Sequence, residues 1–474
     1  MSVIQEFHER RVTVRESAEA WMWTFLEAIA AQNATINAIK ELNPHALAEA
    51  RAWDRTGGSR SDGLLAGVPV LIKDNIAVAS DMHTSGGSLA LSDAYAKADA
   101  FVVSKLRNAG AIILGKANLT EWANFMADHM PNGYSAAGGQ VLNPYGPGVL
   151  DVGGSSSGSG AAVAAGMAPV AIGTETSGSI LSPSSQNSLV GIKPTVGLIS
   201  RSGIIPIAYS QDTAGPMAPT VADAAVLLAA LQGYDPSDPQ TASAPAYPDY
   251  LQDLNAHGLQ HARIGVPRAT FWDGVADEEQ KLFHDSLDLM RRHGAVVVDP
   301  ADIETAGNDW TYDVLLYEFR MSVNAFLAKW IDSGPRTLQA VIEFNSSHQT
   351  KALKYGQAVL IESEATGGRL ADRRYLQARR NDLRWSRQEG IDRTLERYQL
   401  DALVFLGAKG ADIAARAGYP SVTVPMGYTG QGRPLAMTFT GAAFQESRLI
   451  RLAYAFETAA RARRNPEKPR LTEE

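Results

Sequence analysis

Apolar runs of strand length alternate along most of this chain with segments whose apolar residues recur at helical spacing. Strands are expected over residues 68–72, 111–114, 170–173, 264–267, 295–298, 402–406 and 421–425, and the apolar run LAMTFTG follows the last of them. Helices are expected over residues 44–53, 101–108, 158–167, 221–232, 278–293, 312–331, 370–398 and 447–461. Strands that alternate with helices predict an α/β fold, in which a large, mostly parallel sheet is covered by helices on both faces.

The first helix is expected to begin near Thr13. The segment Thr13-Val14-Arg15-Glu16 matches a capping box, in which a hydroxyl and a carboxylate satisfy free N–H groups at a helix start. The run SAEAWMWTFLEAIAAQN that follows has helical apolar spacing. Helices are therefore expected over residues 13–53, ahead of the polar loop GGSRSDG at residues 57–63.

A single domain is expected over residues 1–474. The Pro-rich segment 235–250 reads as a surface excursion, because the alternation of strands and helices resumes after it. The strands expected beyond it are too few and too scattered to support a separate sheet. Residues 236–474 are therefore expected to complete the sheet begun by the first half of the chain.

Composition narrows the class of protein. The chain has 474 residues, of which 45% are hydrophobic and 20% charged, as in a soluble globular protein. A net charge of −8 and the lack of a dense Lys/Arg run argue against nucleic-acid and membrane partners. No window approaches 18 uncharged apolar residues, and the polar start MSVIQEFHERR does not resemble a signal peptide. A cytoplasmic enzyme is expected. Because Cys is absent, disulfides, thiolate metal sites and cysteine nucleophiles are excluded.

The first candidate for chemistry is the Gly/Ser-rich turn GGSSSGSG, which begins at Gly153. It can be a plain flexible turn before a helix, and it lacks the spacing of the common phosphate-binding loops. Its Gly154–Gly158 segment also matches the GxSxG elbow of α/β-hydrolases, with Ser156 in the middle. That interpretation is disfavoured, because no HGGG motif is present and the downstream histidines lie in charged, surface-like segments. Those histidines are His257, His261, His284, His293 and His348.

A second turn, GTETSGSI, follows the strand expected at residues 170–173. Small residues let successive backbone N–H groups converge on one point, as an oxyanion hole requires. A plain loop at the end of a strand remains the alternative. The nine histidines show no metal-ligand spacing, HExxH is absent, and nothing marks Asp151 and Glu175 as a glycosidase pair.

A single lysine, Lys73, interrupts the apolar run GVPVLIKDNI. It can be an edge lysine whose amine reaches water. Alternatively it is buried, in which case desolvation lowers its pKa and makes it a base. Asp74 does not decide between these, because neighbours on a strand face opposite sides. Since no lysine follows a serine by three positions, a lysine base would have to reach its serine across the fold.

In combination, GVPVLIKDNI, GGSSSGSGAAVAAG, GTETSGSI and GIKPTVG resemble the amidase signature family of hydrolases. The resemblance is dense over about residues 64–229 and continues more thinly to the last helix. It implies an α/β/α amidase fold and a Ser–Ser–Lys triad, with Ser179 as nucleophile, Ser155 as bridging serine after a cis peptide, and Lys73 as base. It also implies backbone oxyanion donors at Thr176, Ser177, Gly178 and Ser179. No metal or organic cofactor is implied.

Within that family, the segments NLTEWANF, GGQVLNPY and SQDTAGPM resemble the peptide amidases, which remove ammonia from C-terminal peptide amides. Two departures concern the substrate pocket. Leu181 stands where many relatives have an arginine, which disfavours a carboxylate-bearing substrate, and residues 407–417 are shorter than the matching loop of relatives.

A small-molecule or peptide amide substrate is therefore expected. The alternatives are a broad aryl- or alkyl-amide hydrolase with esterase activity, and a non-catalytic or partner-dependent protein of the amidotransferase type. The sequence does not indicate an oligomeric state.

Overall fold

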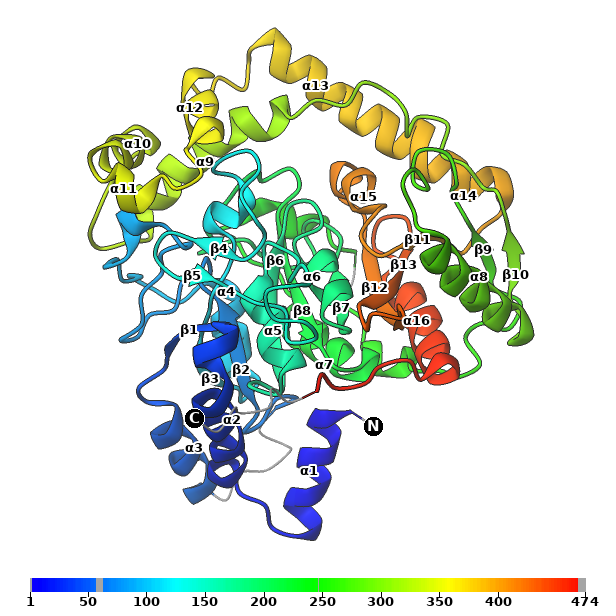
Figure 1. Cartoon of the computed structure of the whole chain (residues 1–474), viewed down its shortest axis with the longest axis horizontal. Helices are drawn as coiled ribbons and strands as arrows, with labels where there is room; N and C mark the ends of the chain where they lie inside the picture. Colours follow the sequence, from blue (N-terminus) through cyan, green and yellow to red (C-terminus); the bar gives the residue numbers. More distant parts are fainter. Residues whose placement is uncertain (1, 57–62, 246, 468–474) are drawn as a thin grey trace.

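An eleven-stranded sheet forms the centre of the computed structural model, which describes residues 2–56, 63–245 and 247–467 (Figure 1). Its strand order is β1-β3-β2-β6-β8-β7-β12-β13-β11-β9-β10. The strands are β1 (Ile39–Leu42), β2 (Pro69–Lys73), β3 (Ile112–Ala117), β6 (Val170–Glu175), β7 (Val190–Lys193), β8 (Thr213–Ala218), β9 (Arg263–Gly265), β10 (Val296–Val298), β11 (Ala402–Leu406), β12 (Ser421–Tyr428) and β13 (Pro434–Thr440). A separate small ribbon pairs β4 (Tyr134–Ser135) with β5 (Gly139–Gln140).

The α/β class with one large sheet is confirmed, but the expectation of a mostly parallel sheet is wrong. Among the described strands, only β2–β3, β2–β6, β9–β10 and β9–β11 pair in parallel. The remaining neighbours, β1–β3, β6–β8, β7–β8, β7–β12, β12–β13 and β11–β13, are antiparallel. One cause is visible between Tyr428 and Pro434, where a short turn joins β12 to β13. A turn of that length can only join antiparallel strands.

Helices cover both faces of the sheet (Figure 1). On one face lie α5 (Ser157–Ala164) and α6 (Leu181–Gln186), which pack on each other and on the central strands. On the other lie α4 (Phe101–Asn108), α7 (Val221–Leu231), α8 (Asp277–Arg292) and α16 (Glu446–Ala460). Helices α1 (Val3–Thr13), α2 (Ala18–Ile36) and α3 (Ala46–Arg55) stand at the β1 end of the sheet.

Helix α5 is buried along its whole length, and its small residues are the reason that it fits. A Cβ atom added at Gly158 would lie 2.3 Å from the carbonyl oxygens of Ala38 and Asn118. Since contacts that short do not occur, only glycine allows the backbone to approach so closely. The close packing holds the N-terminal end of α5, with Ser155 and Ser156, against the sheet.

The expected helix start at Thr13 is wrong. Thr13 ends helix α1, which the apolar pattern did not predict, and its hydroxyl donates to the carbonyl of Glu9 at 2.8 Å. Helix α2 is capped instead by Ser17, whose Oγ accepts the N–H of Ala20 at 3.0 Å. Ser17 thus caps the helix in the way predicted for Thr13, by accepting an N–H three residues further along the chain, but it does so four residues later. The loop expected at 57–63 lies, except for its last residue, outside the described residues.

The Pro-rich segment at residues 235–250 was expected to be a surface excursion. In the structure it is anchored to the core. It forms two short 3₁₀ turns, η4 (Pro239–Ser243) and η5 (Tyr250–Asp253), while residue 246 lies outside the described residues. The buried Asp238 accepts from Arg201 at 2.8 Å and 2.5 Å, and the Tyr250 ring is buried. These contacts hold the segment against the core.

Residues between β10 and β11 form a layer of helices over the top of the molecule in the view of Figure 1. It consists of α9 (Asp313–Lys329), α10 (Leu338–Ser347), α11 (Gln349–Ala352), α12 (Ala358–Ala365), α13 (Arg373–Leu383), the π-helical η6 (Arg384–Ile391) and α14 (Asp392–Tyr398), and α15 (Ala411–Ala417) lies beneath it. A single helix was expected over 370–398. The structure instead has α13, η6 and α14 in succession, with a kink at Gly390, whose φ of −103° and ψ of −111° are not helical.

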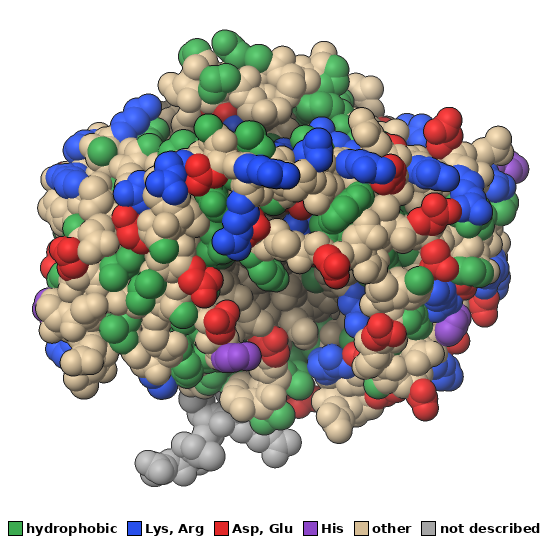
Figure 2. Space-filling model, turned by 90° about the horizontal axis from the view of Figure 1, so that it is seen from above, with side chains coloured by type: hydrophobic (Ala, Val, Ile, Leu, Met, Phe, Trp, Pro, Cys, Tyr) green, Lys and Arg blue, Asp and Glu red, His purple; other side chains and the backbone are tan. Residues whose placement is uncertain are grey.

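The face seen from above is hollowed near its centre, and Lys and Arg side chains form a row beside the hollow (Figure 2). Exposed arginines of α13, η6 and α14 include Arg374, Arg384 and Arg397, whose partners are Asp313, Glu389 and Glu304. Each of these three arginines is thus paired with a carboxylate. None of the helices in the described part of the chain has the length and apolar character that a membrane span requires.

Candidate active site

Lys73 ends strand β2, which lies between β3 and β6, and it is fully buried. Its Nζ atom lies 2.8 Å from the Ser155 hydroxyl, 2.9 Å from Thr174 Oγ1 and 3.3 Å from the Thr174 carbonyl. The parallel register that pairs Ile72 with Ile172 brings the ends of β2 and β6 together, which is why Thr174 reaches the amine. The edge-lysine interpretation is therefore wrong, because the amine is enclosed.

Burial lowers the pKa of Lys73 to about 7. The carboxylates of Glu175 and Asp212 act in the opposite direction but are outweighed by desolvation. A lysine with this pKa is substantially neutral at physiological pH, so its lone pair is available to accept a proton from the hydroxyl beside it.

Ser155 and Ser179 come from two turns that the fold places against each other. The backbone N–H of Ser156 donates to the carbonyl of Ser179 at 3.1 Å, and the Gly154–Ser155 peptide is cis. Ser155 is fully buried, whereas Ser179 is 6% exposed. Within the described residues, the two hydroxyls are not joined by a direct hydrogen bond. Hydrogen bonds of catalytic groups are often long in ligand-free enzymes and tighten when substrate binds.

The hydroxyl of Ser156 has a structural role, because both of its hydrogen bonds go to the backbone of strand β6. It donates to the Thr174 carbonyl at 3.1 Å and accepts the Thr174 N–H at 3.2 Å, and it is fully buried. A serine whose hydroxyl bridges a strand in this way is not presented to a substrate. The elbow interpretation of Gly154–Gly158 has no support in this geometry.

The oxyanion candidates, Thr176 to Ser179, form a tight loop between β6 and α6, which we call the oxyanion loop. Gly178 has φ +82°, a left-handed conformation that favours glycine. Glu175 holds the far side of the loop, because its carboxylate accepts the N–H groups of Ile180 at 2.7 Å and Leu181 at 3.0 Å. Burial raises the pKa of Glu175, while Lys193 and the N–H groups of Leu181, Ile180 and Gly178 oppose that rise.

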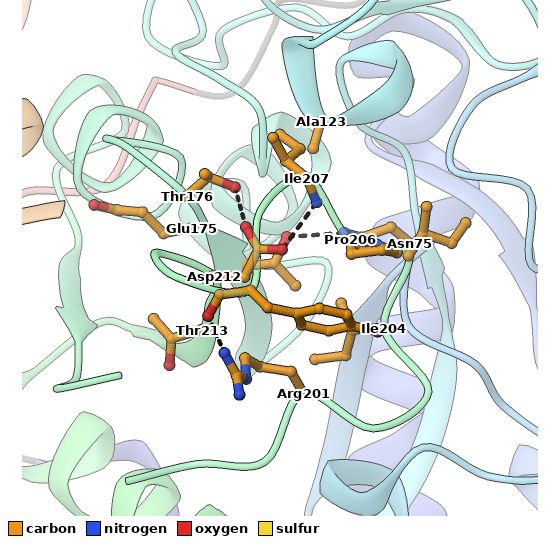
Figure 3. Close-up of a pocket in the computed structure, with 13 residues that line it drawn as sticks. Asn75, Ala123, Glu175, Thr176, Arg201, Ile204, Pro206, Ile207, Asp212 and Thr213 are labelled. Atoms are coloured by element: carbon orange, nitrogen blue, oxygen red, sulfur yellow. Dashed lines mark hydrogen bonds between the residues drawn. The ribbon is translucent and has the colours of Figure 1, made fainter. Parts of the chain in front are cut away.

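A narrow pocket adjoins this loop (Figure 3). Its interior has room for about one water molecule. In it, Asp212 and Thr176 point toward each other, and the Thr176 hydroxyl donates to the carboxylate at 2.6 Å. The second oxygen of Asp212 accepts the N–H groups of Ile207 and Ala208. Burial raises the pKa of Asp212 to about 6.

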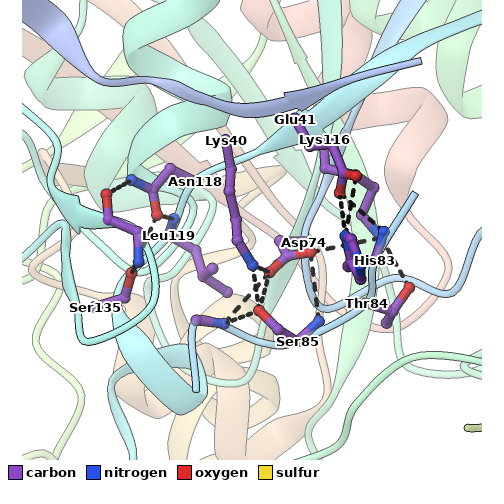
Figure 4. Close-up of polar contacts among 12 residues, drawn as sticks. Lys40, Glu41, Asp74, His83, Thr84, Ser85, Lys116, Asn118, Leu119 and Ser135 are labelled. Carbon is purple, nitrogen blue, oxygen red and sulfur yellow. Dashed lines mark hydrogen bonds and ion pairs between the residues drawn. The ribbon is translucent and has the colours of Figure 1, made fainter. Parts of the chain in front are cut away.

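A separate polar network surrounds Asp74, the residue that follows Lys73 (Figure 4). The buried Asp74 carboxylate accepts from Lys40 at 2.8 Å and from the Ser85 hydroxyl at 2.5 Å, and Lys116 lies 3.8 Å away. Lys116 also donates to Thr84 Oγ1 at 3.1 Å, and burial lowers its pKa to about 8. The opposite orientation of Lys73 and Asp74 is as the sequence predicted.

The short segment at residues 407–417 folds into a turn and helix α15, which packs on the oxyanion loop. A Cβ atom at Gly178 would lie 3.6 Å from the Cβ of Ala411. The Ser177 hydroxyl donates to Asp412 Oδ1 at 3.3 Å. Residues 407–417 therefore form a wall of the site through direct contact with the oxyanion loop.

Sequence reasoning did not identify Thr174, Glu175 or Asp212 as parts of the site. Thr174 and Glu175 lie inside the GTETSGSI motif, at the end of a strand that pairs with β2. Their position at that strand end was the signal that could have identified them. Asp212 lies within SQDTAGPM, more than thirty residues from the loop that it contacts. Only the antiparallel pairing of β8 with β6 brings it there.

The comparison with known families adds the following findings. A model of the amidase family matches residues 21–405. The chain belongs to the amidase family.

Three relatives illustrate where this amidase lies in the family. The solved structure of native peptide amidase from Stenotrophomonas maltophilia has a TM-score of 0.92 and 43% identity, with 98% of each chain covered. A probable amidase of Arabidopsis thaliana is 40% identical over 477 residues, which cover 97% of this chain and 90% of that protein. A glutamyl-tRNA(Gln) amidotransferase subunit from Thermosynechococcus vestitus is 33% identical over 486 residues, covering 96% of this chain and 98% of that protein.

The similarity to a peptide amidase extends over nearly the whole chain, so the resemblance noted in the sequence is confirmed. The amidase is a hydrolase that acts on amide bonds.

Proposed function

We propose that this amidase hydrolyses carboxamides to a carboxylate and ammonia through an acyl-enzyme on Ser179, with Ser155 and Lys73 completing the triad. The observation that supports this most directly is the 2.8 Å contact between Lys73 Nζ and the Ser155 hydroxyl. The pKa of Lys73, lowered by burial to about 7, suits a general base at neutral pH.

In the proposed reaction, neutral Lys73 accepts the proton of Ser155 while Ser155 accepts the proton of Ser179. The Ser179 oxygen attacks the amide carbon, and the carbonyl oxygen becomes an oxyanion. The proton then returns from Lys73 through Ser155 to the departing nitrogen, so that the C–N bond breaks and ammonia leaves. Water, deprotonated by the same relay, hydrolyses the acyl-enzyme to the carboxylate and frees Ser179.

The backbone N–H groups of Thr176, Ser177, Gly178 and Ser179 are proposed to surround the oxyanion. In other enzymes, one such donor contributes roughly 3 kcal/mol to transition-state stabilisation. The hydrogen bonds of Glu175 to Ile180 and Leu181 support this role, because they hold the loop in one conformation before substrate arrives.

The proposed substrates are C-terminal peptide amides. The 43% identity to a peptide amidase over 98% of both chains supports this class. Leu181 is fully buried and apolar, so it offers no cation to a substrate carboxylate. The alternative of a broad aryl- or alkyl-amide hydrolase with esterase activity uses the same triad and differs only in the acyl group that it accepts.

The likeness to an amidotransferase subunit favours a second alternative, in which the chain works only within a complex. Hydrolysis of a simple carboxamide by the isolated chain would contradict it. Equal rates on a peptide amide and on small aryl or alkyl amides would favour the broad amidase over the peptide amidase.

The nucleophile can be tested by intact-protein mass spectrometry after treatment with a serine-reactive fluorophosphonate. We expect a single adduct on the wild type and on Ser156→Ala, and none on Ser179→Ala. Ser156→Ala is the matched control, because it removes a neighbouring hydroxyl of the same motif. An adduct that disappears in Ser156→Ala but persists in Ser179→Ala would contradict the assignment. An unlabelled wild type would favour the partner-dependent alternative.

A further inference from the structure

Asp212 is a buried carboxyl group that lies immediately before strand β8, in the pocket of Figure 3. The cation of the same pocket, Arg201, donates to Asp238 at 2.8 Å and 2.5 Å, so it attracts Asp212 only at longer range. Burial raises the pKa of Asp212 to about 6, against the effect of its hydrogen bonds and of Arg201. The carboxyl group is therefore ionised above neutral pH, and an ionised carboxylate only accepts hydrogen bonds.

The backbone around Asp212 fixes this carboxylate. One oxygen accepts the N–H groups of Ile207 at 2.8 Å and Ala208 at 3.0 Å. The N–H of Asp212 itself donates to the carbonyl of Ala208 at 2.8 Å. The next residue, Thr213, pairs with Glu175 in the antiparallel ladder of β6 and β8. Asp212 is therefore held at several points by the main chain.

Thr176 is the side chain that binds Asp212 within the described residues. Its hydroxyl donates to the other carboxylate oxygen at 2.6 Å, and both residues are buried. Because a charged acceptor cannot donate in return, the direction of the hydroxyl is fixed and the hydrogen bond is a strong one. Thr176 follows Glu175, the last residue of β6, so this bond anchors the oxyanion loop where it leaves the sheet.

The other contacts of the loop do not replace this anchor. The Ser177 hydroxyl donates to Asp412 at 3.3 Å in an exposed contact. Glu175 binds two N–H groups that lie beyond the last residue of the loop. The conformation at Thr176, and with it the direction of the N–H groups that follow, therefore depends on the hydrogen bond to Asp212.

Asp212 does not have the geometry of a group that binds substrate. Both of its oxygens accept hydrogen bonds from the protein, and the pocket beside it has room for about one water molecule. Any effect of Asp212 on the reaction is therefore expected to pass through Thr176.

We propose that Asp212 is a positioning residue, which acts through the Thr176 hydroxyl to hold the N–H groups of the oxyanion loop in place for the oxyanion. This inference rests on the proposed function, because it takes residues 176–179 as the oxyanion donors and Ser179 as the nucleophile. The oxyanion forms only on the way to the transition state. Loss of the anchor should therefore lower kcat and leave KM nearly unchanged.

The test measures kcat and KM for N-acetyl-leucinamide and the rate at which a fluorophosphonate labels Ser179. Rates are taken at pH 9, well above the pKa of Lys73 of about 7, so that this base is neutral in every variant. Asp212→Asn and Thr176→Val should each lower kcat and the labelling rate about 10- to 100-fold, as small misplacements of catalytic groups do. Thr176→Ser keeps the hydroxyl and should recover most of the rate that Thr176→Val loses.

The double variant Asp212→Asn/Thr176→Val should be no slower than the slower single variant, because the two residues act as one unit. The matched control is Asp235→Asn. Asp235 is buried and accepts the Ser200 hydroxyl at 2.6 Å and the N–H of Ser237 at 2.8 Å, so it repeats the hydrogen bonding of Asp212 away from the oxyanion loop. Its kcat and labelling rate should stay near the wild-type values.

A wild-type kcat in Thr176→Val would overturn the inference while leaving the proposed function intact, and so would a raised KM with unchanged kcat. Losses that multiply in the double variant would also overturn it, because Asp212 would then act by a route other than Thr176. If Asp212→Asn did not fold, Thr176→Val and Thr176→Ser would still decide the question. If the wild type neither hydrolysed the amide nor took the label on Ser179, the proposed function would fail, and the inference with it.

Discussion

Lys73 and Asp74 are consecutive residues of one buried strand end, yet their side chains belong to two separate polar networks. The Lys73 amine lies 2.8 Å from the Ser155 hydroxyl, while the Asp74 carboxylate accepts from Lys40 at 2.8 Å on the other side. Burial lowers the pKa of Lys73. Burial alone would raise the pKa of Asp74, but the charges of Lys40 and Lys116 outweigh it and lower that pKa. One network therefore favours a neutral amine and the other an ionised carboxylate.

The activity of this amidase is expected to rise with pH through a midpoint near 7. Lys73 must be neutral to act as a base, and its pKa is lowered to about 7, so the active fraction grows as pH increases through that value. The measurement is kcat/KM for one uncharged carboxamide between pH 5.5 and 9.5. A rate that is flat from pH 6 to pH 9 would contradict the role of Lys73.

Removal of either relay residue is expected to abolish most activity without unfolding the protein. Lys73→Met and Ser155→Ala should each lower kcat by about 10²- to 10⁴-fold, the usual contribution of a general base. The measurement is steady-state hydrolysis beside a circular dichroism spectrum of each variant. Because the two residues act as one unit, the double variant should be little worse than either single one. Wild-type rates in a single variant would rule out the relay.

The stability of Lys73→Met relative to the wild type is expected to depend on pH. Between pH 7 and the ordinary lysine pKa of 10.5, the unfolded chain binds a proton at Lys73 that the native protein does not. The free-energy cost of burying this lysine is therefore present in full below about pH 7. It declines as pH rises above 7 and is lost once pH passes 10.5. The difference in unfolding midpoint, variant minus wild type, should fall between pH 7 and pH 9.5.

Chemical denaturation at several pH values measures that difference. Lys116 and Lys193 also have lowered pKa values, but both are present in the two proteins, so their effects cancel. A difference that is constant with pH would mean that Lys73 keeps its ordinary pKa in the folded protein.

Asp74→Asn is expected to destabilise the protein strongly. The change leaves the buried Lys116 without its carboxylate and weakens the tie between Lys40 and the turn at Ser85. Removing one partner of a buried ion pair costs about 3–5 kcal/mol. Urea unfolding measures the loss. The control is Asp285→Asn, which breaks a solvent-exposed pair with Lys281 and should change the unfolding free energy far less. Similar losses for the two variants would contradict a special role for the Asp74 network.

Local sequence patterns were sufficient for the fold class and for most of the strands, while the residues of the proposed triad came from the resemblance to the amidase signature family and stay a prediction. The run around Lys73 and the two Gly/Ser turns are short-range patterns, since strand periodicity and turn formation depend on neighbours in the chain. The helix α1 was missed because its polar residues hide the few apolar ones that it buries, Ile4 and Phe7. The antiparallel centre of the sheet was missed because local periodicity does not specify which strands pair.

The tertiary structure alone decided the environment of these residues. Whether Lys73 is a solvated cation or a neutral base depends on desolvation by β6 and its neighbours, which no local pattern reports. The contacts of Thr174 with Lys73 and of Asp412 with Ser177 join residues far apart in the sequence. Residue types along the chain thus determined which groups are available for chemistry. Strand order and helix packing determined which of them meet, because distances and burial exist only in the folded chain.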